Sequence, residues 1–151
     1  MVRKRVLAAG LLGALVSVGG IVVAQKPAPT VQVYKSPTCG CCANWVAHLQ
    51  QHGFTTRVTE TDDVASIKTQ RGVPARVQSC HTAVVDGYVI EGHVPAADVQ
   101  RLLKERPAVV GIAVPGMPIG SPGMEVPGQK PQKYDVVAFD KQGQIRVFAS
   151  H

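Results

Sequence analysis

Aromatic residues are scarce in this 151-residue sequence, which contains one tryptophan, three tyrosines and three phenylalanines. Its Lys and Arg residues are scattered and are nowhere interleaved with aromatic side chains, as a nucleic-acid groove would require, so the sequence argues against DNA or RNA binding. It has no carboxylate pair and no set of Ser, His and Asp that suggests hydrolysis. No internal repeat is present, and the length fits one domain with one modest core.

The N-terminal segment has the layout of a secretory signal peptide. Three positive charges lie at positions 3–5, and residues 6–24 carry no charge. Val22 and Ala24 fit the minus-three and minus-one positions of a cleavage site. About 20 apolar residues can also span a bilayer, so a retained membrane anchor is the alternative. The Ala and Gly residues that dilute the run favour cleavage.

Cleavage divides the chain into three parts. Residues 1–24 are the predicted signal peptide, and the mature chain begins at Gln25. A Pro-containing linker over residues 25–30 then leads into one domain over residues 31–151. We therefore expect an exported, periplasmic protein, which would be anchored to the membrane only if the segment were not cleaved.

Hydrophobic periodicity, turn signals and capping residues predict an α/β domain. The expected strands are 31–34, 54–59, 81–85 and 88–91, the last two joined by the hairpin signal Asp86-Gly87. The expected helices run from Cys42 to a stop at Gly53, from Asp62 to Gln70, and from Pro95 to about Arg106. This β-α-β-α-β-β-α order predicts a thioredoxin-like fold, in which helices bridge parallel strands and an antiparallel hairpin follows.

The C-terminal part is an addition to that fold. Residues 111–133 are dominated by Gly, Pro and Met, and residues 136–139 and 145–148 predict a second hairpin. The segment 111–133 is too rich in Met and Val for a solvated linker, so we expect it to pack on the domain.

The most informative stretch is a cysteine cluster placed where the first strand passes into the first helix. Cys39 and Cys42 have the C-x-x-C spacing, and the N-terminus of a helix stabilises thiolates, the form of cysteine that attacks disulfides or binds metals. The spacing alone does not choose between these roles. Cys41 favours a soft metal, because a third thiol would scramble the disulfide of a dithiol enzyme.

A fourth cysteine is predicted to face this cluster. In a thioredoxin-like fold, the loop opposite the C-x-x-C normally carries a cis-proline, but here it contains Cys80 and His81, and the nearest proline, Pro74, lies upstream. Three cysteines from one loop and Cys80 from the other would give four sulfur ligands, or three sulfurs and a nitrogen if His81 replaces one of them.

Distinctive motifs lie at residues 37–42, 79–83, 91–96, 114–118 and 120–125. Together they resemble the CopG-like family of small periplasmic proteins often encoded beside copper-resistance genes, and the resemblance covers nearly all of residues 31–148. It implies a thioredoxin-like fold and a copper-binding, redox-capable role in metal homeostasis. It also implies that Cys39, Cys41, Cys42 and Cys80 are the ligands. Thiolates favour Cu(I), and zinc is the other metal that such a site would accept.

Other interpretations of the same residues remain open. The four cysteines would also fit two structural disulfides, although the adjacency of Cys41 and Cys42 argues against it. His81 is either a metal ligand or a hydrogen-bonded histidine at a strand end. The sequence assigns His48 to the helix surface and His93 to a cap or packing position before the third helix. Met117 and Met124 offer thioether sulfur to Cu(I), but packing is the simpler role for both.

Two further functions compete with copper binding. The first is a periplasmic thiol-disulfide oxidoreductase that uses Cys39 as the nucleophile and Cys42 as its resolving partner. The second is a module that docks through its Gly/Pro/Met segment on envelope copper-handling proteins or a transporter.

Overall fold

We analysed a computed structural model, which describes residues 29–151. The predicted signal peptide and residues 25–28 of the predicted linker lie outside the described residues. Within residues 29–151, no helix is long and apolar enough to cross a membrane.

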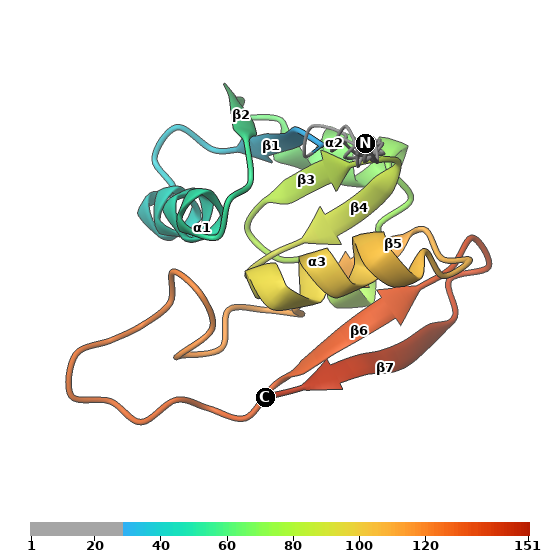
Figure 1. Ribbon diagram of the computed structural model, residues 1–151. Coiled ribbons are helices and arrows are strands. Elements are labelled where there is room, and N and C mark those ends of the chain that lie inside the picture. The colour runs from blue at the N-terminus through green and yellow to red at the C-terminus, as the bar shows by residue number, and fades with distance from the viewer. Residues whose placement is uncertain (1–28) are drawn as a thin grey trace, which may run out of the picture.

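Residues 29–151 form a mixed α/β fold with one seven-stranded sheet and three α-helices (Figure 1). The elements in chain order are β1 (Val31–Lys35), α1 (Gly40–Gln51), β2 (Thr56–Glu60), α2 (Val64–Gln70), the 3-10 helix η1 (Ala75–Val77), β3 (Thr82–Val85), β4 (Tyr88–Glu91), α3 (Ala96–Glu105), β5 (Gly111–Ala113), β6 (Asp135–Phe139) and β7 (Ile145–Ser150). The predicted order of elements up to α3 is confirmed.

The strand order is β2-β1-β3-β4-β5-β6-β7. β1 and β2 are parallel and are joined through α1, because a parallel pair needs a crossover connection. β3 runs antiparallel to both β1 and β4, and a tight turn at Asp86-Gly87 links β3 to β4. The turn residues have φ values of 48° and 88°, the left-handed conformation that hairpins of this kind require.

The two faces of the sheet are covered differently, because strand side chains alternate between faces. One face carries Ile90 and Ile112 and packs against α1 and α3, which contribute Trp45, Leu49 and Leu102. The opposite face carries Val89, Ala113 and Phe139, which pack with Val73 and Val77 from the segment around η1. The larger core therefore lies under α1, the helix that begins at the cysteine cluster.

The C-terminal segment differs from its prediction. Residues 111–113 form β5, which pairs parallel with β4 and antiparallel with β6. The second hairpin, β6 and β7, was predicted as an addition to the fold, and β5 makes it a continuation of the same sheet. A strand of three residues that begins with glycine gives no alternation signal. Gly111 is needed there because a Cβ at this position would lie 2.0 Å from the carbonyl oxygen of Val89.

Candidate metal centre

The cysteine cluster forms the first turn of α1. A turn after β1 is closed by the Cys39 N–H, which donates to the Ser36 carbonyl (3.1 Å), and Cys39 then serves as the N-cap of the helix. Its side chain makes no capping hydrogen bond. The sulfurs of Cys39 and Cys41 are 3.5 Å apart, and Cys42 is fully buried while Cys39 and Cys41 are half-buried.

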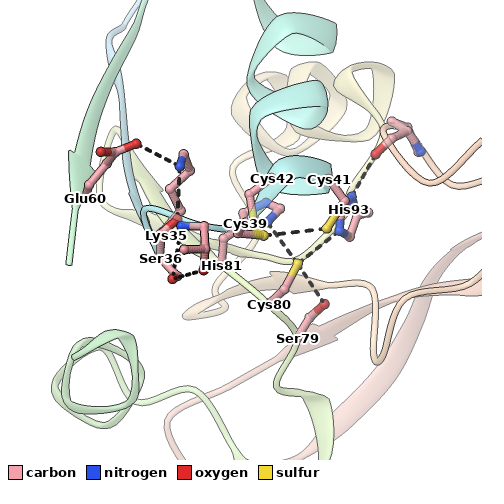
Figure 2. Close-up of a disulfide and its surroundings, with 12 residues drawn as sticks. Lys35, Ser36, Cys39, Cys41, Cys42, Glu60, Ser79, Cys80, His81 and His93 are labelled. Carbon is pink, nitrogen blue, oxygen red and sulfur yellow. Dashed lines mark hydrogen bonds and ion pairs between the residues drawn. A yellow bond between two sulfur atoms is a disulfide. The ribbon is translucent and has the colours of Figure 1, made fainter. Parts of the chain in front are cut away.

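Cys80 approaches this turn from the loop between η1 and β3 (Figure 2). The sulfur atoms of Cys39, Cys41, Cys42 and Cys80 all lie within 4.8 Å of one another. Three of them come from one helical turn, and the fourth arrives because β3 lies beside β1 in the sheet. The four residues predicted as ligands thus share one place, and their role as ligands stays a prediction.

The sequence predicts a site of four thiolates, but two of the four cysteines are oxidised in the structure. Cys39 and Cys42 form a disulfide, with their Cα atoms 5.4 Å apart. Cys41 and Cys80 are free thiols. Thiol pairs outside the cytosol tend to oxidise to such a state. A four-thiolate site requires that this disulfide be reduced by two electrons.

His93 lies at the centre although the sequence analysis did not include it among the candidate ligands. Its Nε2 is 3.0 Å from the Cys80 sulfur, and its Nδ1 is 2.8 Å from the carbonyl oxygen of Pro122. A carbonyl only accepts, so Nδ1 carries the proton and donates it to Pro122. Burial lowers the pKa of His93, which favours the neutral ring. Nε2 therefore presents a lone pair towards Cys80, as a metal-binding histidine does.

Of the two roles predicted for His93, packing is confirmed, because its side chain is fully buried, and capping is wrong. The N-cap of α3 is Pro95, and it is His48 whose Nε2 accepts the Ala96 N–H (3.1 Å) at the start of that helix. Burial also lowers the pKa of His48, which favours the neutral ring that this hydrogen bond requires. Only the pairing of β3 with β4 brings His93 to Cys80, so short-range sequence patterns carry no signal for it.

His81 is fully buried beside the same sulfur. Its Nδ1 lies 3.3 Å from the Cys80 sulfur, and its ring packs against Trp45 with centroids 4.3 Å apart. Burial holds the pKa of His81 well below its usual value, so the ring is neutral. Within the described part of the chain, His81 Nε2 has no hydrogen-bond partner. Cys80, His81 and His93 form a second group of donor atoms within 4.8 Å, and Cys80 belongs to both groups.

Cys80 holds its proton tightly in the metal-free protein. Burial and the neighbouring Cys41 raise the pKa of Cys80 to about 11. The thiol is therefore protonated at neutral pH and is a poor nucleophile. A metal ion that binds this sulfur has to displace the proton, which a soft cation does more readily than a hard one.

In the segment between β5 and β6, residues 118–124 pack on the centre, as predicted for residues 111–133, whereas residues 125–133 are exposed. Ser121, Pro122 and Gly123 are buried, and the Ser79 hydroxyl donates to the Gly116 carbonyl. Met117 does not follow its prediction as a packing residue, because 51% of its surface is exposed. The loop therefore closes one side of the cysteine cluster and leaves Met117 in contact with solvent.

Gly123 allows this close approach. Its φ is +83°, and a Cβ there would lie 2.7 Å from the backbone nitrogen of Trp45 and 2.8 Å from the Cys41 carbonyl oxygen. We expect Gly123→Ala to lower the free energy of unfolding by about 2–4 kcal/mol, through left-handed strain and a backbone clash. Gly128→Ala is the matched control, because Gly128 has a φ of +79° and open space around it. If urea denaturation gave the same decrease in the free energy of unfolding for both variants, the contact of Gly123 with α1 would be unimportant for stability.

Comparisons with known proteins show which proteins this chain is similar to. A family model described as a protein of unknown function, DUF411, matches residues 77–124. Two solved structures are similar over most of the chain, and both carry the name copper resistance protein CopG, one as form 1 and one as form 2. Each is 44% identical with a TM-score of 0.78, and each match covers 98% of the solved chain and 82% or 83% of this one. No curated protein matches.

Proposed function

Because this chain belongs to the family of copper resistance protein CopG, we propose that it is an exported copper-binding protein of metal homeostasis. Cys39, Cys41, Cys42 and Cys80 bind Cu(I) when the Cys39–Cys42 disulfide is reduced. The observation that carries the proposal is the gathering of four sulfur atoms within 4.8 Å from two separate segments of the chain.

The donor set fits a soft metal. Thiolates select Cu(I) and zinc over calcium or magnesium, and a neutral imidazole suits both of the favoured metals. His93 adds such a nitrogen with its lone pair already directed at Cys80, while His81 either binds the metal or supports Cys80. Copper is the metal that the relatives' name indicates, so Cu(I) is preferred to zinc.

The fold supports a thioredoxin-like classification. We assign it because a helix joins the parallel pair β1 and β2, because an antiparallel hairpin follows, and because the C-x-x-C lies at the N-terminus of α1. Redox activity at this place is part of the proposal. The dithiol of Cys39 and Cys42 loses two electrons and two protons when it forms the disulfide, and this change removes two of the four thiolates.

The disulfide also favours the second candidate, a periplasmic thiol-disulfide oxidoreductase. Two features argue against it. None of the peptide bonds among residues 29–151 is cis, and Cys80 and His81 lie in the loop where such enzymes have their cis-proline. Cys41 also lies 3.5 Å from Cys39, close enough to compete for the disulfide.

Metal analysis tests the function. Protein purified anaerobically from an export-competent host should contain copper, and the reduced, metal-free protein should show little turnover in an insulin-reduction assay. Rapid insulin reduction without copper in the purified protein would establish the oxidoreductase instead.

Export is tested separately. We expect envelope-extracted protein to have the intact mass of a chain that begins at Gln25, since Val22 and Ala24 fit a cleavage site. The domain over residues 31–151 then follows the linker 25–30. A species that retains residues 1–24 and fractionates only with membranes would identify the segment as an anchor.

A further inference from the structure

The loop that carries Cys80 is held at both ends by one buried carboxylate. Glu91, the last residue of β4, accepts the backbone N–H of Ser79 through Oε1 (2.6 Å) and the hydroxyl of Thr82 through Oε2 (2.7 Å). Cys80 and His81 are the two residues between these anchor points. We call residues 79–82 the Cys80 arch.

Lys68 of α2 balances the charge of this carboxylate. Its Nζ donates to Glu91 Oε1 (2.5 Å) and to the Thr82 hydroxyl (3.0 Å). Glu91 is fully buried and Lys68 is 6% exposed, so the ion pair lies inside the protein. Burial raises the pKa of Glu91, and the bonds from Lys68, Thr82 and Ser79 oppose that rise.

Stability alone does not explain a buried ion pair at this position. Removing two charges from water is costly, and well-packed apolar residues of similar volume are often as stabilising or more so. An apolar pair, however, cannot satisfy the Ser79 N–H or hold the Thr82 hydroxyl. The bonds to the Cys80 arch are therefore what the carboxylate contributes beyond packing.

The residue that follows Glu91 ties His93 to the Cys80 arch. After Glu91 the chain continues through Gly92, whose N–H donates to the His81 carbonyl (3.0 Å). A Cβ on Gly92 would lie 2.6 Å from Ser79 Cβ, so this contact with the arch is close. The 3.0 Å separation between the Cys80 sulfur and His93 Nε2 is thus held by the bonds of Glu91 to the arch and by the contacts of Gly92, the residue before His93.

We infer that Glu91, supported by Lys68, is a positioning residue that holds the Cys80 thiol and His93 in the geometry needed to bind the metal. This inference rests on the proposed metal site. It assigns a role to a buried pair that touches no proposed ligand atom directly and acts through Ser79 and Thr82.

Two double variants isolate the hydrogen bonds from the charge. Lys68→Met with Glu91→Gln removes the ion pair but keeps an acceptor for the Ser79 N–H and an amide donor for the Thr82 hydroxyl. Lys68→Met with Glu91→Leu removes both charges and both bonds. Asp98→Asn is a control for the loss of a buried carboxylate elsewhere, because Asp98 is 6% exposed and its side chain bonds to His151, which follows β7.

The first measurement is competition with a Cu(I) chelator under anaerobic, reducing conditions. We expect the Gln double variant and Asp98→Asn to bind within a few-fold of the parent. The Leu double variant should bind about 10- to 100-fold more weakly, the usual effect of losing a residue that orients a ligand. Its midpoint in urea should be no lower than that of the Gln double variant. Equal Cu(I) affinity of the two double variants would overturn the inference.

The second measurement needs no metal. With the Cys39–Cys42 disulfide intact, only Cys41 and Cys80 react with an alkylating reagent, and peptide mass spectrometry separates them. The ratio of Cys80 to Cys41 labelling should rise several-fold in the Leu double variant and stay unchanged in the Gln double variant. An unchanged labelling ratio in both double variants would refute the positioning role, whether or not the parent binds Cu(I). Failure of the parent to bind Cu(I) would refute the proposed function alone.

A single variant covers the case in which the Leu double variant does not fold. Thr82→Val keeps the shape of the side chain and the ion pair but removes one of the two anchor bonds of the arch. We expect a smaller rise in Cys80 labelling and a smaller loss of Cu(I) affinity, both in the same direction. If Thr82→Val had the same Cys80 labelling and the same Cu(I) affinity as the parent, the inference would be contradicted.

Discussion

Cys80→Ser is expected to weaken Cu(I) binding by at least about 100-fold, more than the loss of a residue that only orients a ligand. Cys80 is the one sulfur that reaches the cluster from outside α1, and it belongs to both groups of donor atoms. A hydroxyl is a poor ligand for a soft cation. The measurement is a competition titration against a Cu(I) chelator under reducing, anaerobic conditions, with calorimetry on the same samples.

Stability provides the control for this prediction. The metal-free Cys80→Ser protein should melt close to the metal-free parent, because the strands and the Asp86-Gly87 turn that position residue 80 do not depend on its sulfur. His81→Ala and His93→Ala show which imidazole binds the metal. Removing the ligand should lower the Cu(I) affinity about as much as Cys80→Ser does. Equal chelator competition by parent and Cys80→Ser would refute the four-cysteine site.

Cu(I) is expected to raise the melting temperature of the reduced parent by roughly 10–20 °C. A ligand that binds only the native state stabilises it by about 4 kcal/mol at a free concentration 1,000 times its Kd, and a domain of this size gains several degrees for each kcal/mol. The protein with the Cys39–Cys42 disulfide should gain less than half as much, because only Cys41, Cys80 and the histidines remain as donors.

A double variant separates redox state from ligand number. Cys39→Ser with Cys42→Ser cannot form the disulfide and also lacks both thiolates. It should show the same small gain on adding Cu(I) with and without reductant, measured by differential scanning calorimetry. If the oxidised parent instead gains as much as the reduced parent, Cys39 and Cys42 are not ligands.

The local sequence was sufficient to predict the order of elements from β1 to α3. Asp86-Gly87 marks the β3–β4 hairpin, Gly53 follows the first helix within two residues of its end, and Asp63 caps α2 by accepting the Ser66 N–H. These signals act over a few residues, so they can be recognised in the sequence without knowledge of tertiary contacts. The placement of Cys80 opposite the first turn of α1 followed from that order.

The remaining features depend on contacts between distant residues. The strand β5 is defined by its neighbours β4 and β6, and nothing within Gly111–Ala113 marks it. The role of His93 follows from two partners that lie 13 and 29 residues away, Cys80 and Pro122. A lysine is normally exposed, and the burial of Lys68 in α2 depends on its bonds to Glu91 and Thr82. Whether Cys39 and Cys42 are oxidised depends on redox conditions, which a sequence does not encode.

The position of β5 determines how the chain can be shortened. A protein that ended after α3 would keep every element of the β-α-β-α-β-β-α order, yet the backbone of β4 would lose its partner along Val89–Glu91. That strand is buried on both faces, so the cut would create a hydrophobic edge with open N–H and C=O groups, the kind that recruits other chains into aggregates. The loop that supplies Pro122 to His93 would be lost as well. The smallest folding unit of this protein therefore extends beyond α3 and includes β5 and the loop that contains Pro122.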